Sequence, residues 1–151
     1  MRDCVFCDIV NGRGEASIVW QDDQVCAFLD IQPVNAGHIL VVPNEHAACL
    51  SDLPPESGAH MFRVAQRLAQ ALRDSSLPCE GVNMFLADGE AAMQEVFHVH
   101  LHVFPRVRGD GFGVTFGANY FARPTRGELE DVGEKIRRTV GPLLADDVGG
   151  R

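Results

Sequence analysis

The sequence predicts an α+β fold: an antiparallel sheet of about five strands with a long helix and a C-terminal helix. Short runs rich in β-branched residues follow one another in hairpin order, separated by turn residues. Two longer segments have apolar residues at helical spacing. The length of 151 residues suits a single domain, which we expect to cover residues 1–145, followed by a frayed tail at 146–151.

The first third of the chain predicts one short helix and three strands. Asn11-Gly12 is a helix stop, and Asp22-Asp23 separates two strand patterns as a hairpin turn would. Gly37 and Pro43 bound an apolar, β-branched run. The expected elements are a helix over 4–10 and strands over 17–21, 24–31 and 38–42.

The remaining two thirds predict the two longer helices and two more strands. Pro54-Pro55 begin a helix that extends to 74, and its apolar residues fall on one face. Strands are expected over 82–87 and 96–104. The glycine-rich segment 106–117 is expected to be mobile. A capping box at Thr125 to Glu128 begins the C-terminal helix.

Charge and hydropathy narrow the function classes. The net charge of −8 argues against nucleic-acid binding, which needs a basic surface. No apolar run is long enough to span a bilayer, and the N-terminus is too polar for a signal peptide. We therefore expect a cytoplasmic protein without nucleic-acid or membrane partners.

The most informative segment is the predicted strand at 96–104, because histidine alternates with apolar residues. Side chains point alternately to the two faces of a strand. His98, His100 and His102 therefore share one face, and the other carries Phe97, Val99, Leu101 and Val103, which we expect in the core. Three aligned imidazoles indicate metal binding or phosphate chemistry. A metal-dependent hydrolase is disfavoured because no acidic residue follows closely in the sequence.

The histidine run and several other segments resemble the histidine-triad (HIT) superfamily. Residues 98–104 match its His-φ-His-φ-His-φ-φ signature, where φ is apolar. Residues 28–31 and 37–43 resemble the family's nucleotide-binding segment, and residues 88–92 with Gln94 resemble the loop before the triad. The N-terminal Cys-x-x-Cys resembles that of zinc-containing bacterial members, so a HIT-like fold is expected.

The resemblance implies an enzyme that acts at the α-phosphate of a nucleotide. His100 would be the nucleophile, giving a nucleotidyl-histidine intermediate that water hydrolyses. His102 and His38 would complete the phosphate site, and His98 would orient its neighbours. The implied substrates are nucleoside phosphoramidates, dinucleoside polyphosphates or adenylylated compounds, with a purine nucleotide or its conjugate as the ligand.

The resemblance also implies a nucleotide-binding set. Asp30 would accept hydrogen bonds from the ribose hydroxyls, and backbone N–H groups before Val96 would meet the phosphate charge. Four apolar residues would hold the base, although the residues alone are equally compatible with plain core. The expected nucleotide-binding residues are Phe6, Ile9, Phe28, Asp30, Ile31, Gln94, Glu95 and Val96.

A structural zinc site is expected at the N-terminus. Cys4 and Cys7 supply two soft ligands at a spacing typical of structural zinc, and the resemblance adds His46 and His98. Such a set is closed and tetrahedral, so the ion would be structural.

Two departures from the family pattern keep a second function open. Ala87 stands where members commonly carry Asn or Gln, and Met93 stands where glycine is usual. They favour the alternative of a zinc-stabilised nucleotide-binding or interaction module with weakened catalysis. The resemblance also implies a homodimer. The apolar face of the helix over 54–74 is the candidate interface, and the sequence is equally compatible with packing of this face on the chain's own sheet.

Overall fold

The structure, a computed structural model, describes residues 4–148 and divides the chain into two compact units, with the boundary after Phe112. Within two residues, most elements of the first unit begin and end as the sequence predicts. They are α1 (Val5–Val10), β1 (Ile18–Gln21), β2 (Val25–Leu29), β3 (Ile39–Pro43), η1 (Leu50–Asp52), α2 (Pro55–Asp74), β4 (Gly81–Leu86), η2 (Glu90–Ala92) and β5 (Leu101–Arg106).

The five strands form one sheet in the order β1-β2-β3-β5-β4, and every neighbouring pair is antiparallel. The predicted α+β class is therefore confirmed. Asp22 shapes the β1–β2 turn, because its Oδ1 accepts the N–H groups of Gln24 and Val25 at 2.9 Å each. β2 ends at Leu29, so Asp30 and Ile31 lie in the turn beyond it.

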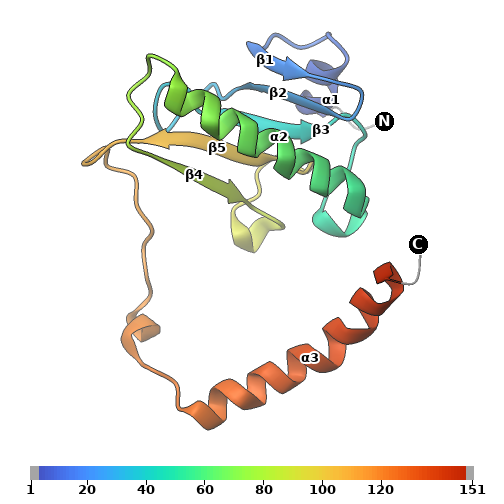
Figure 1. Cartoon of the computed structure of the whole chain (residues 1–151), viewed down its shortest axis with the longest axis vertical. Coiled ribbons are helices and arrows are strands. Elements are labelled where there is room, and N and C mark those ends of the chain that lie inside the picture. The colour runs from blue at the N-terminus through green and yellow to red at the C-terminus, as the bar shows by residue number, and fades with distance from the viewer. Residues whose placement is uncertain (1–3, 149–151) are drawn as a thin grey trace. The chain divides into compact units, whose positions relative to one another are not determined.

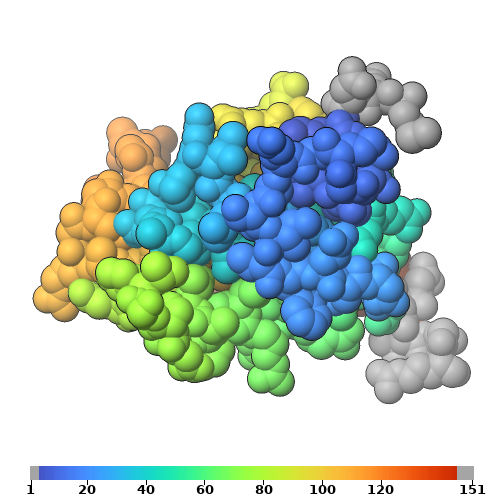
Figure 2. All heavy atoms as spheres, turned by 90° about the horizontal axis from the view of Figure 1, so that it is seen from above, coloured from blue at the N-terminus to red at the C-terminus, as the bar shows by residue number. Residues whose placement is uncertain are grey.

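The alternation of side chains divides the core between the two faces of this sheet. Helix α2 packs on one face and α1 on the other (Figures 1 and 2). On β3, Ile39 and Val41 belong to the α2 side, whereas Leu40 and Val42 belong to the α1 side. Because both faces of β2 and β3 are covered, these two strands are apolar throughout.

The predicted strand over 96–104 is wrong at its start, because β5 begins only at Leu101. Its partner β3 ends in Pro43, which has no N–H to donate to a longer ladder. The Pro43 carbonyl instead lies 2.9 Å from Nε2 of the His98 ring. Phe97 therefore precedes the strand and is 44% exposed, contrary to its predicted place in the core.

Val99, Leu101 and Val103 lie in the core against α2, as the alternation predicts. The apolar face of α2 packs on the chain's own sheet through Met61, Ala65 and Leu72. That face is therefore not available as the expected dimer interface. The homodimer itself stays a prediction.

The second unit contains η3 (Ala118–Phe121) and α3 (Arg126–Val148). The capping box is confirmed: Thr125 N–H donates to the Glu128 carboxylate at 2.7 Å, and Glu128 N–H donates to Thr125 Oγ1 at 3.3 Å. α3 continues through 146–148, where a tail was expected, and 149–151 lie outside the described residues. Within 4–148 no helix combines the length and apolar composition that crossing a membrane requires.

Candidate active site and metal centre

A cavity of about 820 Å³ opens on the α1 side of the sheet, beside the histidines. Its walls come from α1, the end of β2 with the following turn, and the segment before β5. All the expected nucleotide-binding residues except Gln94 line this cavity, and so do His100 and His102. The structure thus brings together groups from five separate parts of the sequence, which lie within residues 5–9, 15–17 and 28–32, at Leu40, and within residues 95–102.

The apolar wall of the cavity is also part of the core. The Phe6 ring contacts Phe28 edge-on at 5.4 Å between centroids, and it contacts the His100 ring at 5.2 Å. Both phenylalanines are buried. The sequence left open whether these residues belong to the core or to the cavity wall, and Phe6 and Phe28 belong to both. Ile31 differs, because it is 93% exposed at the rim.

His100 has one ring nitrogen fixed by the backbone. Its Nδ1 lies 2.7 Å from the carbonyl oxygen of His98, which can only accept a hydrogen bond. In the neutral ring the proton is therefore on Nδ1, and Nε2 carries the lone pair. Because His100 also lines the cavity, that lone pair is its remaining reactive group.

His38 and His102 are joined in a directional chain of hydrogen bonds. The backbone N–H of Val34 donates to His38 Nδ1 at 3.1 Å, so the neutral His38 ring carries its proton on Nε2. This Nε2 lies 2.9 Å from His102 Nδ1 and donates to it. The proton of neutral His102 is therefore on its Nε2. His102 offers the cavity a donor where His100 offers an acceptor.

Burial keeps the hydrogen-bonded rings of His38 and His102 uncharged. Burial, followed by the neighbouring His100 and His38, lowers the pKa of His102 to about 4. Burial also lowers the pKa of His38, against the opposing charge of Asp30. Asp30 Oδ2 lies 3.6 Å from His38 Nε2 and 4.0 Å from His102 Nδ1. Near neutral pH both rings are neutral and the hydrogen-bond directions above apply.

Asp30, His38 and His102 are close enough to be considered as metal ligands, since their candidate atoms lie within 4.8 Å of one another. The hydrogen bond from Val34 argues against this use. A metal on His38 Nε2 would force the ring proton onto Nδ1, where it would face the Val34 N–H. The direction of this hydrogen bond therefore makes the three residues a poor metal site.

The second cluster has the geometry of a tetrahedral zinc site. Cys7 Sγ lies 3.3 Å from His46 Nδ1 and 3.6 Å from His98 Nδ1, and the two Nδ1 atoms are 3.3 Å apart. Zinc bonds of usual length place ligand atoms about 3.3–3.8 Å from one another in a tetrahedron. Cys4 Sγ completes the set at 3.5 Å from His98 Nδ1. The donor atoms therefore fit zinc.

His98 is oriented for this cluster and not for the cavity. Its ring is fully buried, and Nε2–H donates to the Pro43 carbonyl at 2.9 Å, which leaves the Nδ1 lone pair for a metal. Burial and Cys4 raise the pKa of the Cys7 thiol to about 11, and a divalent cation would bring both sulfurs to the thiolate form. The expected orienting role of His98 belongs to its backbone carbonyl, which fixes His100.

Gln94 does not reach the cavity. Its amide Nε2 donates to the carbonyl of Ala48 at 2.8 Å, and its Oε1 accepts the N–H of Gly89 at 2.7 Å. It braces the loop before β5. Ala87 is buried, and Met93 adopts a left-handed backbone with φ 69° while its side chain is 72% exposed. Met93 thus adopts the conformation that favours glycine, without crowding the cavity.

Sequence reasoning missed three kinds of group at the site. The Val34 N–H is a backbone group, and residue identity carries no signal for it. The Pro43 carbonyl is another backbone partner of a histidine. Glu15 lines the cavity next to α1, and only its position after the short helix could have indicated it.

The comparisons with known proteins agree with this geometry. The family model described as the HIT domain matches residues 11–109. A HIT-like protein of Mycobacterium tuberculosis is 42% identical over 123 residues, which cover 82% of this chain and 85% of the relative. Adenylylsulfatase HINT3 of Arabidopsis thaliana is 32% identical over 109 residues, covering 72% and 55%.

A solved structure extends the likeness to the metal. A Zn-bound histidine triad family protein from Mycobacterium smegmatis has 40% sequence identity and a TM-score of 0.71, over 95% of this chain and 97% of that one. Its zinc is consistent with the tetrahedral donor set of this chain. The histidine pattern, the sheet and the family match lead to one conclusion: the chain belongs to the HIT domain family.

Proposed function

We propose that this protein is a nucleotide hydrolase or nucleotidyl transferase that acts at the α-phosphate through a nucleotidyl-histidine intermediate. One observation carries the proposal: beside the same cavity, His100 has a lone pair on Nε2 and His102 has an N–H on Nε2. Displacement at phosphorus needs a nucleophile and a proton donor together. The name of the Arabidopsis relative, an adenylylsulfatase, supports an adenylyl group as the part of the substrate that is attacked, and carries no support for the leaving group.

In the first step His100 Nε2 attacks the α-phosphorus, and the bond to the leaving group breaks. His102 Nε2–H is placed to donate to the phosphate or the leaving group. In the second step water attacks the same phosphorus and the bond to His100 breaks. The nucleoside monophosphate leaves, the water proton passes to solvent or a neighbouring base, and His100 Nε2 regains its lone pair.

The cavity walls suggest how the nucleotide lies. Phe6 and Phe28 offer an apolar surface to the base, with Ile9 beside them, and Ile31 covers it from the rim. Asp30 lines the same cavity and can accept from the ribose hydroxyls. Glu95 and Val96 border the end near His100, where their backbone can approach the phosphate.

The charge of the cavity favours a leaving group that is not an anion. Its acidic lining residues are Glu15, Asp30 and Glu95, and neither lysine nor arginine is found among the described residues that line it. A polyphosphate leaving group would meet these carboxylates without a cation to compensate. An amine leaving group meets no such repulsion. Among the candidate substrates we therefore favour nucleoside phosphoramidates.

The proposed role of zinc is structural. Four protein ligands close the tetrahedron and leave no position for a water molecule or substrate. Cys4 and Cys7 come from the N-terminal segment, and His98 precedes β5. A bound ion would tie α1, and with it the Phe6 wall, to the segment that carries His100.

The proposal is tested with wild type and His100→Asn on an AMP phosphoramidate, with acid-quenched samples analysed by mass spectrometry. We expect AMP release and an adenylyl adduct on wild type, and a loss of about 10³-fold or more in turnover by the variant. His60→Asn is the matched control, because His60 lies on α2 and pairs with Asp22. Tight AMP binding without turnover by wild type would favour the alternative of a binding module.

A further inference from the structure

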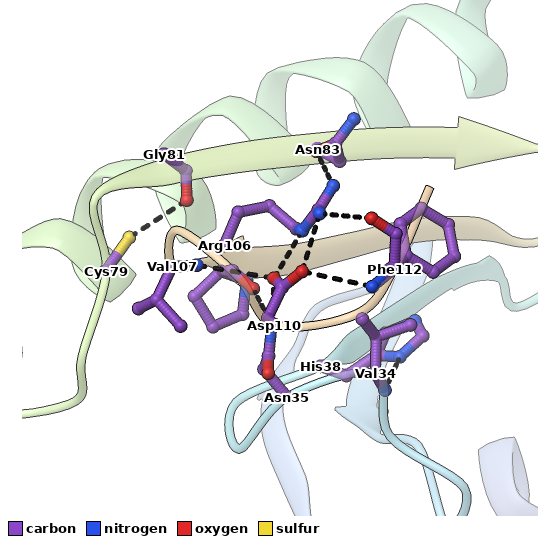
Figure 3. A network of polar contacts seen from close by, with 11 residues as sticks. Val34, Asn35, His38, Cys79, Gly81, Asn83, Arg106, Val107, Asp110 and Phe112 are labelled. Atoms are coloured by element: carbon purple, nitrogen blue, oxygen red, sulfur yellow. Dashed lines mark hydrogen bonds and ion pairs between the residues drawn. The ribbon is translucent and has the colours of Figure 1, made fainter. Parts of the chain in front are cut away.

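A partly buried ion pair between Arg106 and Asp110 lies at the end of β5, near His38 (Figure 3). The Asp110 carboxylate, whose side chain is 3% exposed, accepts from Arg106 Nε at 2.6 Å and Nη2 at 2.7 Å. Arg106 Nη2 also donates to the Phe112 carbonyl at 2.7 Å, and Nη1 donates to Asn83 Oδ1 at 2.9 Å. We call Arg106, Asp110 and Asn35 the clasp.

Asn35 connects the ion pair to the turn before β3. Its Nδ2 donates to Asp110 Oδ2 at 2.8 Å and to the Pro105 carbonyl at 2.9 Å, so both amide hydrogens are used. Its backbone carbonyl accepts the N–H of His38 at 3.0 Å. Asn35 is therefore fixed through its side chain to β5 and through its backbone to His38.

The residue before Asn35 supplies the hydrogen bond that decides the His38 tautomer. Val34 N–H reaches His38 Nδ1 at 3.1 Å, and Val34 lies in a turn outside any strand. If Val34 moves, His38 Nδ1 loses the only hydrogen-bond partner that it has within residues 4–148, and Asp30 Oδ2, 3.6 Å from Nε2, is then the one remaining group that favours a proton on Nε2. Where this weaker contact does not hold the proton on Nε2, the proton moves to Nδ1. The ring would then accept through Nε2, His102 would have to donate through Nδ1, and His102 Nε2 would lose its proton.

The clasp is also connected to His38 through two aromatic rings, Phe112 and Phe104. The Arg106 guanidinium carbon lies 4.9 Å from the centre of the Phe112 ring, which contacts Phe104 edge-on at 5.1 Å. The Phe104 ring lies 4.8 Å from that of His38. Two independent routes, one polar and one apolar, thus connect the clasp to the same imidazole.

We propose that Asn35, held by Asp110 and Arg106, is a positioning residue that sets the direction of the His38–His102 hydrogen bond. It acts through the Val34 N–H and is not among the residues that line the cavity. The effect on turnover rests on the proposed function above, whereas the effect on the tautomers does not. The effect on the tautomers distinguishes a positioning role of the clasp from a role that only stabilises the loop.

The test measures the protonation of each imidazole nitrogen by ¹⁵N NMR on the full-length, zinc-loaded protein near pH 7. In wild type we expect an unprotonated Nδ1 and a protonated Nε2 on His38. In Asn35→Ala we expect a mixed or reversed pattern on His38 and His102, and a fall in kcat of roughly tenfold or more with a smaller change in KM. Asn83→Ala is the control, because it removes an Arg106 contact and leaves Asn35 in place.

Two outcomes overturn the proposal: a His38 pattern in folded Asn35→Ala that equals wild type, or an equal disturbance in Asn83→Ala. If Asn35→Ala does not fold, Asn35→Ser replaces it, since a hydroxyl keeps one donor toward Asp110. A smaller shift in the same direction supports the proposal, and an unchanged pattern overturns it. Wild type without turnover but with the expected tautomers would count against the proposed function alone.

Discussion

The metal cluster and the cavity use neighbouring histidines in opposite ways. In the cluster, the Nδ1 atoms of His46 and His98 lie 3.3 Å apart, and both point their lone pairs toward one ion position. Beside the cavity, His38 Nε2 lies 2.9 Å from His102 Nδ1, and these two nitrogens face each other as donor and acceptor. Similar distances between imidazole nitrogens thus belong to two different kinds of chemistry.

The difference comes from the backbone group that one ring nitrogen of His98, His100 and His38 meets. His98 and His100 each donate to a carbonyl, but through opposite nitrogens, Nε2 in one and Nδ1 in the other. His38 instead accepts from a backbone N–H. The backbone partner fixes the tautomer, and the tautomer decides whether the ring can bind a metal, attack phosphorus or donate a proton.

The largest expected effect is on stability, and it follows from removing a ligand of the metal cluster. In Cys7→Ser we expect zinc content to fall from about one ion per chain to near zero, and the free energy of unfolding to fall by about 3 kcal/mol or more. Metal analysis and urea unfolding measure the two quantities. Cys79→Ser is the matched control, because Cys79 lies outside the cluster. An unchanged zinc content in Cys7→Ser would contradict the assigned ligand set.

Removing the proton donor is the next effect in size. In His102→Ala we expect kcat on an AMP alkylphosphoramidate to fall about 10²-fold, because the leaving amine then receives no proton. A phosphoramidate of an acidic amine needs less help, so its kcat should fall much less. Steady-state kinetics on the two substrates give the comparison. An equal loss on both would show that His102 does not protonate the leaving group.

The neutral imidazoles also make stability depend on pH. Because burial lowers the pKa of His102 from 6.5 to about 4, the unfolded chain binds a proton between these values that the folded chain does not bind. This contribution is complete above pH 6.5 and declines as the pH falls toward 4. Between pH 7 and pH 5 we expect a loss of about 1–2 kcal/mol from this residue.

Urea unfolding at the two pH values measures the loss, and His102→Gln is the comparison because glutamine does not titrate. The variant should lose less stability than wild type between pH 7 and pH 5. If the two proteins lose the same amount, His102 is not held neutral by the fold, and the direction assigned to the His38–His102 bond loses its support.

The sequence predicted those features that depend on neighbours along the chain. Alternation placed Val99, Leu101 and Val103 in the core, and the capping box placed the start of α3. The start of β5 was missed because it depends on where the partner strand β3 ends, at Pro43. The start of a strand of this kind is set by pairing across the sheet and not by its own sequence.

The clasp was missed for the same reason. Residues 106–117 were expected to be mobile because they are rich in glycine, yet Arg106 and Asp110 are joined to Asn35, 75 positions from Asp110. Nothing local marks these residues as partners. Gln94 was expected at the nucleotide for its place in the motif, whereas its contacts show it bracing the loop. A motif therefore predicts which residue type stands at a position, whereas long-range contacts decide where its side chain points.

The smallest expected effect concerns Met93, the one non-glycine residue with positive φ among 4–148. A left-handed conformation costs an ordinary residue about 1–2 kcal/mol, and glycine avoids this cost. Glycine also makes the unfolded chain more flexible, which offsets part of the stabilisation. Met93→Gly should therefore raise the free energy of unfolding by about 0.5–1 kcal/mol. The side chain is exposed, so little packing is lost. Urea unfolding measures the change, with Met84→Gly on β4 as a control that should destabilise; a loss of stability in Met93→Gly would mean that the methionine side chain holds the loop before β5.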